Sequence, residues 1–259
     1  MIDPELIRQA ANLIIKAQLT VALTGAGVST PSGIPDFRST NSGLWASVDP
    51  MEVASLNGFR TNPEAFYRWV KPLAKTLLAA KPNPAHVALA RLEALGLLTV
   101  VVTQNIDMLH ERAGSHHVLE IHGHLREATC IHCYRTTLAA ELLRRWLEEA
   151  VLPRCEVCGH VMKPNVILFG EQLPALVFNE AKLAVKQCDL ILVAGSSLEV
   201  FPAAELPLLA VERGAKLIVV NREPAFLDER AAVLIRADVA EALPMLADEV
   251  SHVSRPRKA

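Results

Sequence analysis

Short apolar runs alternate with longer amphipathic stretches along this chain. Four runs, at residues 20–23, 98–102, 190–194 and 217–220, are rich in apolar and β-branched residues and are bounded by turn residues, which predicts buried strands. Residues 6–18 carry apolar side chains at helical spacing, and further helical stretches separate the strands. Apolar strands that alternate with helices are typical of a parallel sheet. We therefore expect an α/β fold with a Rossmann-like parallel sheet covered by helices on both faces.

The first predicted strand ends in a glycine turn, Gly25-Ala26-Gly27. Backbone N–H groups in such a turn can approach a pyrophosphate, which then lies against the positive end of the next helix. As a dinucleotide fingerprint the turn is incomplete, because Thr30 replaces the third glycine and no acidic residue ends a second strand about 20 residues later. A tight turn without a ligand is the alternative. Asp36, Phe37 and Arg38 favour the ligand, since a purely structural turn needs none of them.

The other predicted strands also end in polar or glycine-rich loops. Ligands of parallel sheets bind outside the carboxyl ends of the strands, so these loops are expected at one common edge. Together they offer what an extended dinucleotide needs. The loops are Thr103 to Asp107, Gly195-Ser196-Ser197 and Asn221.

Two segments interrupt the alternation and predict a smaller second domain. Residues 40–84 are helical or irregular and rich in aromatic residues, and residues 127–162 hold four cysteines around a helix predicted over 138–149. The first would form a helical module and the second a zinc-binding module. The Rossmann-like domain is then predicted over residues 1–39, 85–126 and 163–259, and the small domain over residues 40–84 and 127–162.

Four of the five cysteines form two Cys-x-x-Cys pairs, Cys130 with Cys133 and Cys155 with Cys158. In a reducing compartment, two such pairs about 20 residues apart fit a tetrahedral Zn²⁺ better than disulfides. Four thiolates leave no open position on the ion, so the zinc is expected to be structural; two redox or incidental pairs are the alternative. Cys188 precedes an apolar run and is most simply a small buried hydrophobe.

Composition narrows the class of protein. The chain has 259 residues, 51% of them hydrophobic, with a formal net charge of −2. Such a balance gives no global basic field for nucleic acid or an anionic membrane. The N-terminal residues lack the charged flank and apolar segment of a signal peptide, and no apolar run approaches the roughly 18 residues of a membrane span. We therefore expect a cytoplasmic protein without direct nucleic-acid or membrane binding.

Several separated motifs, in order along nearly the whole chain, resemble the sirtuin family. This resemblance implies an NAD-dependent protein-lysine deacetylase, which consumes NAD⁺ and an acetylated lysine peptide or protein and forms lysine, nicotinamide and O-acetyl-ADP-ribose. The motifs are Gly25-Ala26-Gly27-Val28-Ser29, Gly33-Ile34-Pro35-Asp36-Phe37-Arg38, Gln104-Asn105-Ile106-Asp107, His122-Gly123, the four cysteines, Lys163-Pro164-Asn165, Phe169-Gly170-Glu171 and Gly195-Ser196-Ser197-Leu198.

The resemblance also implies roles for individual residues. His122 is the expected general base and Asn105 a second catalytic residue; an imidazole suits proton removal from a ribose hydroxyl near neutral pH. Only the resemblance selects His122 over His116, His117 and His124. The expected NAD-binding residues are Gly25, Ala26, Gly27, Thr30, Ile34, Asp36, Phe37, Arg38, Gln104, Asn105, Ile106, Asp107, Gly195, Ser196, Ser197, Asn221 and Val239, with Ile34, Asn105, Ile106 and Asp107 around nicotinamide.

The acyl-lysine peptide is expected to bind as an added strand between two segments, one of which forms an apolar tunnel. These segments supply Ile167, Phe169, Gly170, Leu198 and Val200. Each of three of these residues has a purely structural alternative when the resemblance is set aside. Asp107 could be a loop cap, Phe169 an ordinary core residue and Asn221 a turn residue.

One departure from the family concerns the acyl group. Members that prefer succinyl-lysine or malonyl-lysine resemble one another in a tyrosine followed three residues later by an arginine. Here Tyr67 is kept and Val70 stands at the arginine position, so acetyl-lysine is the expected substrate.

Three other functions remain open on sequence alone. The fold by itself also suits a reversible NAD oxidoreductase. The cysteines also suit a zinc-ribbon module for nucleic acid, although the acidic balance and the lack of a basic, aromatic face disfavour it. The third is ADP-ribosyl transfer by the same site.

Overall fold

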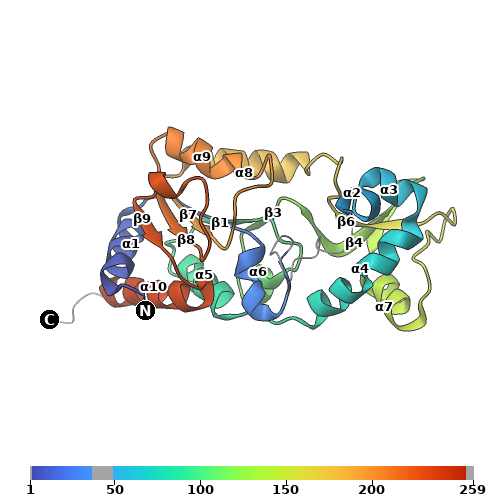
Figure 1. The fold of residues 1–259 in the computed structure, drawn as a ribbon, viewed down its shortest axis with the longest axis horizontal. Helices are drawn as coiled ribbons and strands as arrows, with labels where there is room; N and C mark the ends of the chain where they lie inside the picture. Colours follow the sequence, from blue (N-terminus) through green and yellow to red (C-terminus); the bar gives the residue numbers. More distant parts are fainter. Residues whose placement is uncertain (1, 37–48, 255–259) are drawn as a thin grey trace.

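A computed structural model of the chain describes residues 2–36 and 49–254. The larger domain is built on a six-stranded sheet in the order β3-β2-β1-β7-β8-β9, and all neighbouring strands are parallel (Figure 1). The order reverses between β1 and β7, which creates the crevice where ligands of such sheets bind. The strands are β1 (Thr20–Thr24), β2 (Val100–Thr103), β3 (Val118–Glu120), β7 (Leu190–Ala194), β8 (Lys216–Val220) and β9 (Val233–Ile235).

Helices cover both faces of this sheet, as predicted (Figure 1). α1 (Pro4–Lys16), α5 (Pro84–Ala94) and α10 (Val239–Ser254) enclose one apolar core, and α8 (Ala175–Gln187) and α9 (Glu205–Glu212) enclose the other. Successive side chains of a strand point to opposite faces, so a strand between two cores is apolar on both faces where it meets them. In β1, Ala22 belongs to the first core, and Val21 and Leu23 to the second.

Some local predictions differ from the structure. β3 and β9 are three residues each, too short for their patterns to stand out from loops, and were not predicted. The helix expected after the glycine turn is wrong: between β1 and residue 36, where the first described stretch ends, the chain forms two single 3₁₀ turns, at Ala26–Val28 and Thr30–Ser32. Pro31 and the left-handed Gly33 interrupt the helical path there.

The small domain lies beside the carboxyl end of the large sheet (Figure 1). Its antiparallel sheet has the order β5-β4-β6, and its core is rich in aromatic side chains. The predicted domain boundary between residues 126 and 127 lies inside β4, and the one between residues 162 and 163 follows the first residue of β6. The exact division into two domains therefore stays a prediction. The elements are α2 (Pro50–Val53), α3 (Leu56–Thr61), α4 (Pro63–Ala79), β4 (Gly123–Cys130), β5 (Thr136–Leu138), α7 (Ala140–Glu149) and β6 (Met162–Val166); α6 (Leu109–Arg112) lies between β2 and β3.

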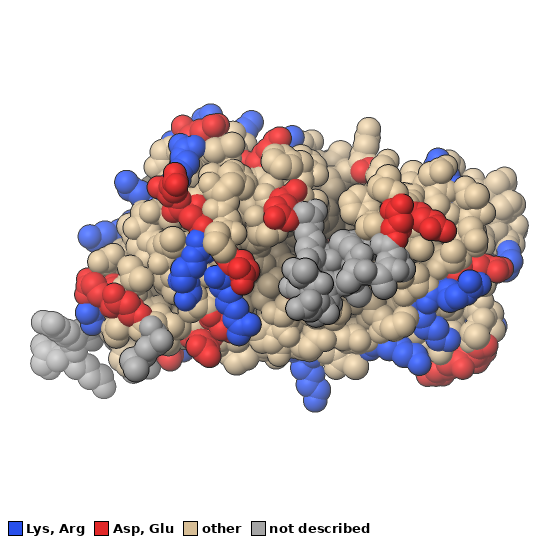
Figure 2. Space-filling model, viewed as in Figure 1, with Lys and Arg blue, Asp and Glu red and all other residues tan. Residues whose placement is uncertain are grey.

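None of the helices in the described parts of the chain combines the length and the apolar character that crossing a membrane requires. On the face drawn in Figure 2, positive and negative side chains are interspersed around a hollow between the two lobes. The molecule thus presents no single-sign field on this face, as its small net charge implies.

Candidate active site

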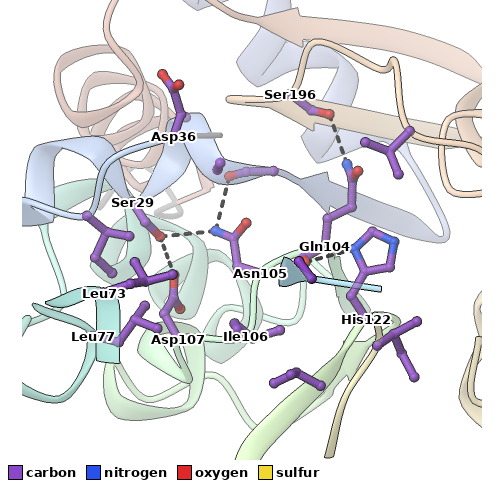
Figure 3. Close-up of a pocket in the computed structure, with 18 of the residues that line it drawn as sticks. Ser29, Asp36, Leu73, Leu77, Gln104, Asn105, Ile106, Asp107, His122 and Ser196 are labelled. Carbon is purple, nitrogen blue, oxygen red and sulfur yellow. Dashed lines mark hydrogen bonds between the residues drawn. The ribbon is translucent and has the colours of Figure 1, made fainter. Parts of the chain in front are cut away.

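A cavity of about 1240 Å³ opens between the two domains, at the crevice between β1 and β7. Its wall on the large domain is mostly polar loop, and its wall on the small domain is mostly apolar helix and strand (Figure 3). Phe37 and Arg38 lie outside the described residues. The predicted residues that line the cavity are Gly25, Ala26, Gly27, Thr30, Ile34, Asp36, Gln104, Asn105, Ile106, Asp107, His122, Ile167, Phe169, Gly170, Gly195, Ser196, Ser197, Val200, Asn221 and Val239.

The glycines at the crevice allow two loops to touch. Gly27 donates its N–H to the carbonyl of Gly195 at 2.9 Å, and a Cβ on Gly27 would lie 2.8 Å from that oxygen. Gly195 has φ +60°, and a Cβ there would lie 2.3 Å from the backbone nitrogen of Val28. These glycines are therefore required for loop packing, whatever ligand the turn holds.

The loop after β7 is tied to its neighbours by paired hydrogen bonds. The Asn221 side chain accepts from the Ser196 backbone N–H at 3.0 Å and donates to the Ser196 carbonyl at 2.7 Å. Gln104 donates to the Ser196 hydroxyl at 2.9 Å (Figure 3). Asn221 thus shapes the loop directly, and its proposed contact with adenosine stays a prediction.

A buried cluster of side chains forms the floor of the cavity (Figure 3). The Ser29 hydroxyl donates to Asp107 at 2.6 Å and accepts from the Asn105 amide at 3.0 Å, and Asn105 also donates to the Gly25 carbonyl at 3.1 Å. Asp107 in addition accepts from the Leu109 N–H at 2.9 Å, so it closes the loop before α6 as well as holding Ser29. Asp107 therefore acts as a loop cap and also lines the cavity.

Two fully buried histidines behind this floor were missed in the sequence. His86 lies 3.4 Å from the Ser29 hydroxyl, and its ring meets that of His110 edge-on at 4.8 Å. Burial lowers the pKa of His86 to about 4, partly opposed by Asp107, and lowers that of His110 to about 3. Both are therefore neutral near pH 7. Neither histidine belongs to a motif, and a histidine among apolar residues usually marks an ordinary core position.

His122 is oriented by a backbone carbonyl. Its Nδ1 lies 3.0 Å from the Gln104 carbonyl, which can only accept, so Nδ1 carries the proton and Nε2 keeps its lone pair (Figure 3). Burial lowers the pKa of His122 further than the Gln104 carbonyl raises it. Near neutral pH the ring is therefore a free base at the cavity wall.

The small-domain wall of the cavity is apolar. Val70 lines it, while the Tyr67 hydroxyl is occupied by a 2.6 Å hydrogen bond to the Met162 carbonyl. Phe169 is 40% exposed at the rim, so the alternative of an ordinary core residue is wrong for it. Leu198, expected beside the peptide, is 2% exposed within the second core, which leaves only its backbone for such a contact.

The four predicted ligands form one cluster in the small domain. The Sγ atoms of Cys130 and Cys158 are 3.4 Å apart, those of Cys133 and Cys155 are 3.6 Å apart, and all four lie within 4.8 Å of one another. A tetrahedral Zn²⁺ with bonds of about 2.3 Å needs sulfur separations of about 3.8 Å, so the cluster fits zinc. A metal binds these sulfurs as thiolates, so filling the site would release their protons.

Comparison with known proteins points to one family over nearly the whole length. The model of the Sir2 family matches residues 25–202. A relative from Archaeoglobus fulgidus, named NAD-dependent protein deacylase 2, is 46% identical and covers 95% of this chain and 97% of its own. A solved structure described as a basis for the mechanism and regulation of Sir2 enzymes has a TM-score of 0.91, 45% identity and coverage of 97% and 100%. A Sir2 structure with a deacetylated p53 peptide and 3′-O-acetyl ADP ribose has a TM-score of 0.87, 40% identity and coverage of 96% and 98%.

Proposed function

We propose, from the premise that this chain belongs to the Sir2 family and is an NAD-dependent protein-lysine deacetylase, that His122 is the base of that reaction. The observation that carries this proposal is the hydrogen bond from Nδ1 to the Gln104 carbonyl, because it fixes Nε2 as the proton acceptor. His116 is exposed, and so is His117, which contacts Glu180 at 3.0 Å. Neither lines the cavity among the residues described.

The reaction consumes NAD⁺: nicotinamide leaves the ribose, and the acetyl group is transferred from lysine to ADP-ribose, with water completing the hydrolysis. His122 takes a proton from a ribose hydroxyl, which makes that oxygen a better nucleophile. Asn105 and Asp107, held by Ser29, offer an amide and a carboxylate to the nicotinamide carboxamide. The loops at Gly25 and Ser196 would hold the pyrophosphate and ribose, and Asn221 with Val239 the adenosine end.

We further propose that the acyl end accepts acetyl-lysine and disfavours succinyl-lysine. Val70 lines the cavity where a cation would be needed, and Arg68 on the same helix is exposed. Residues two apart on a helix do not share a face, so Arg68 points elsewhere. Acetylated peptides or proteins are the proposed substrates, and the rim residues Phe169, Gly170 and Val200 would flank the peptide.

The protein carries one structural zinc, held by Cys130, Cys133, Cys155 and Cys158. Zinc here supplies folding free energy and not chemistry, because four thiolates complete its coordination. A cluster of reduced thiolates suits a reducing compartment, so we propose a cytoplasmic location.

The test is mass spectrometry of an acetyl-lysine peptide incubated with NAD⁺ and the protein. We expect deacetylated peptide, free nicotinamide and O-acetyl-ADP-ribose, with no absorbance from reduced cofactor. Reduced cofactor without nicotinamide would indicate an oxidoreductase. An ADP-ribosylated peptide or protein without deacetylation would indicate ADP-ribosyl transfer.

A further inference from the structure

Lys163, on β6, is a buried lysine that takes no part in the proposed reaction. Its Nζ contacts three oxygen atoms: the Val166 carbonyl at 2.7 Å, Glu171 Oε2 at 3.0 Å and the Pro164 carbonyl at 3.1 Å. An ammonium has three donors, so every proton finds an acceptor. The side chains of Lys163 and Glu171 are only 11% and 18% exposed. A charge this withdrawn from water persists only when it is paired, and here it is.

The ion pair closes the segment of residues 163–171 on itself. Glu171 Oε2 accepts not only from Lys163 but also from the backbone N–H of Leu168 at 2.8 Å. One carboxylate oxygen thereby fixes the turn that carries Phe169 and Gly170. Gly170 has φ +83°, a conformation that a free chain would hold only part of the time.

The same segment joins the parts of the proposed active site. The Ile167 N–H donates to the His122 carbonyl at 2.9 Å, which links the segment to the proposed base. The Phe169 N–H donates to the Ala54 carbonyl, and the Leu56 N–H donates to the Phe169 carbonyl, both at 2.9 Å. Residues 167–170 therefore form a backbone edge, which the ion pair holds at one end and which His122, Ala54 and Leu56 hold along its length.

We propose that Lys163 and Glu171 are positioning residues for the acylated peptide, holding the edge of residues 167–170 in the shape that the peptide pairs with. This inference rests on the proposed function, since it assumes that the edge receives an acyl-lysine peptide. A preformed edge avoids the entropy of ordering the loop during binding. Neither side chain is placed at the reacting atoms, so the pair acts on peptide affinity and leaves NAD⁺ affinity alone.

The test uses Glu171→Gln, Lys163→Met and the double variant in the full-length, zinc-loaded protein. Binding of a fluorescein-labelled peptide with one acetyl-lysine is measured by anisotropy, and KM is measured separately for peptide and for NAD⁺. We expect a tenfold or larger loss of peptide affinity in each single variant, with the KM for NAD⁺ within twofold of wild type. The double variant should recover part of the loss, because it removes both buried charges together.

Two controls separate positioning from stability. Arg144→Met breaks an exposed ion pair with Glu141 in the small domain, and Val250→Ala opens a cavity in the α10 core far from the edge. Both should keep the ratio of the two KM values, even where Val250→Ala lowers the melting temperature. A purely structural role for the ion pair would give the same unchanged ratio in Glu171→Gln.

Glu171→Gln keeps the shape and an acceptor for Leu168, so it decides the outcome if Lys163→Met does not fold. Wild-type peptide affinity in Glu171→Gln, or an equal rise in both KM values, would overturn the inference. Failure of the proposed function looks different: wild-type protein itself would then release no nicotinamide and deacetylate no peptide.

Discussion

The two domains gain their stability in different ways. In the large domain, β1 and β7 are buried at every position, and apolar cores lie on both faces of the sheet. In the small domain, all three residues of β5 are exposed, and the cysteine cluster connects the loops around the sheet. The loops that carry these cysteines have an exposed strand between them, so a bound metal would contribute much of the free energy that folds this part of the small domain, beside its aromatic core.

The cavity between the domains depends on each of them in a different way. The large domain supplies the polar loops and the proposed base from a scaffold that two apolar cores stabilise. The small domain supplies the apolar wall from a scaffold that depends on one ion. Substitution of a site residue in the large domain should abolish catalysis and leave the protein folded. Loss of the zinc site in the small domain should abolish catalysis and unfold that domain.

The largest effect expected is therefore from Cys155→Ala or a strong chelator. Loss of a zinc ligand should unfold the small domain and abolish deacetylation, while the large domain keeps its protection from hydrogen exchange. Metal analysis and hydrogen exchange measure both effects. Cys188→Ala is the matched control: this fifth cysteine is buried beside the sheet, and its variant should keep zinc and activity. A wild-type protein without zinc, or with a disulfide among the four cysteines, would contradict the prediction.

His122→Ala should affect the chemistry of the site and leave both folds intact. Removal of the base should lower the turnover number by roughly 100-fold to 10,000-fold, with zinc content and melting temperature close to wild type. His116→Ala serves as the control, because His116 is exposed and outside the cavity lining. Turnover near wild type in His122→Ala would remove His122 from the mechanism.

The sequence predicted the elements whose signals are local. The four long strands are continuous apolar runs, and the zinc ligands are two short motifs, so no long-range information was needed to find them. β3 and β9 were missed because three residues cannot show a period. The helix after β1 was wrongly expected because the glycine turn was interpreted from dinucleotide folds, whereas Pro31 and Gly33 give only 3₁₀ turns.

The contacts that hold the site were beyond prediction for a different reason. Ser29, His86 and Asp107 meet from three separate elements, and nothing in their local sequence says that they touch. The carbonyl that fixes the tautomer of His122 belongs to the backbone of Gln104, and a backbone acceptor leaves no mark in a sequence. Only the family resemblance selected His122 among nine histidines.

Acyl selectivity tests the apolar character of the small-domain wall. A succinyl carboxylate entering that wall loses its hydration without gaining a cation, and even a partial penalty of about 3 kcal/mol lowers kcat/KM roughly a hundredfold. The measurement is the ratio of kcat/KM for an acetyl peptide to kcat/KM for the matched succinyl peptide, at saturating NAD⁺. Val70→Arg should narrow it by improving succinyl turnover, and Arg68→Ala should leave it unchanged. Equal kcat/KM values in wild type would show that another basic residue reaches the acyl group.

The smallest effect expected lies in the large domain, at His110. The Thr24 hydroxyl donates to Thr103 at 2.9 Å and so accepts from His110 Nε2 at 2.9 Å, which leaves Nδ1 as the basic nitrogen. Nδ1 is buried and meets no hydrogen-bond partner among the described residues. Protonating it would bury a charge beside His86, which is why burial lowers the pKa of His110 to about 3.

The sign of the pH dependence follows from this lowered pKa. Below about pH 6.5 the unfolded chain binds a proton at His110, whereas the folded protein does not until about pH 3. Stability from this group is thus complete above pH 6.5 and is lost as pH falls toward 3, at up to about 1.4 kcal/mol per pH unit. His110→Gln keeps a donor for Thr24 without titrating, so the slope of unfolding free energy against pH, from urea melts between pH 6 and 4, should decrease by that amount.

Zinc content is followed at each pH so that metal loss is not counted as unfolding. His252→Gln, on the exposed side of α10, is the control and should leave the slope unchanged. An unchanged slope in His110→Gln would mean that the buried pair takes up protons in the folded protein, and that the polar floor of the cavity is less withdrawn from water than the rest of the large domain.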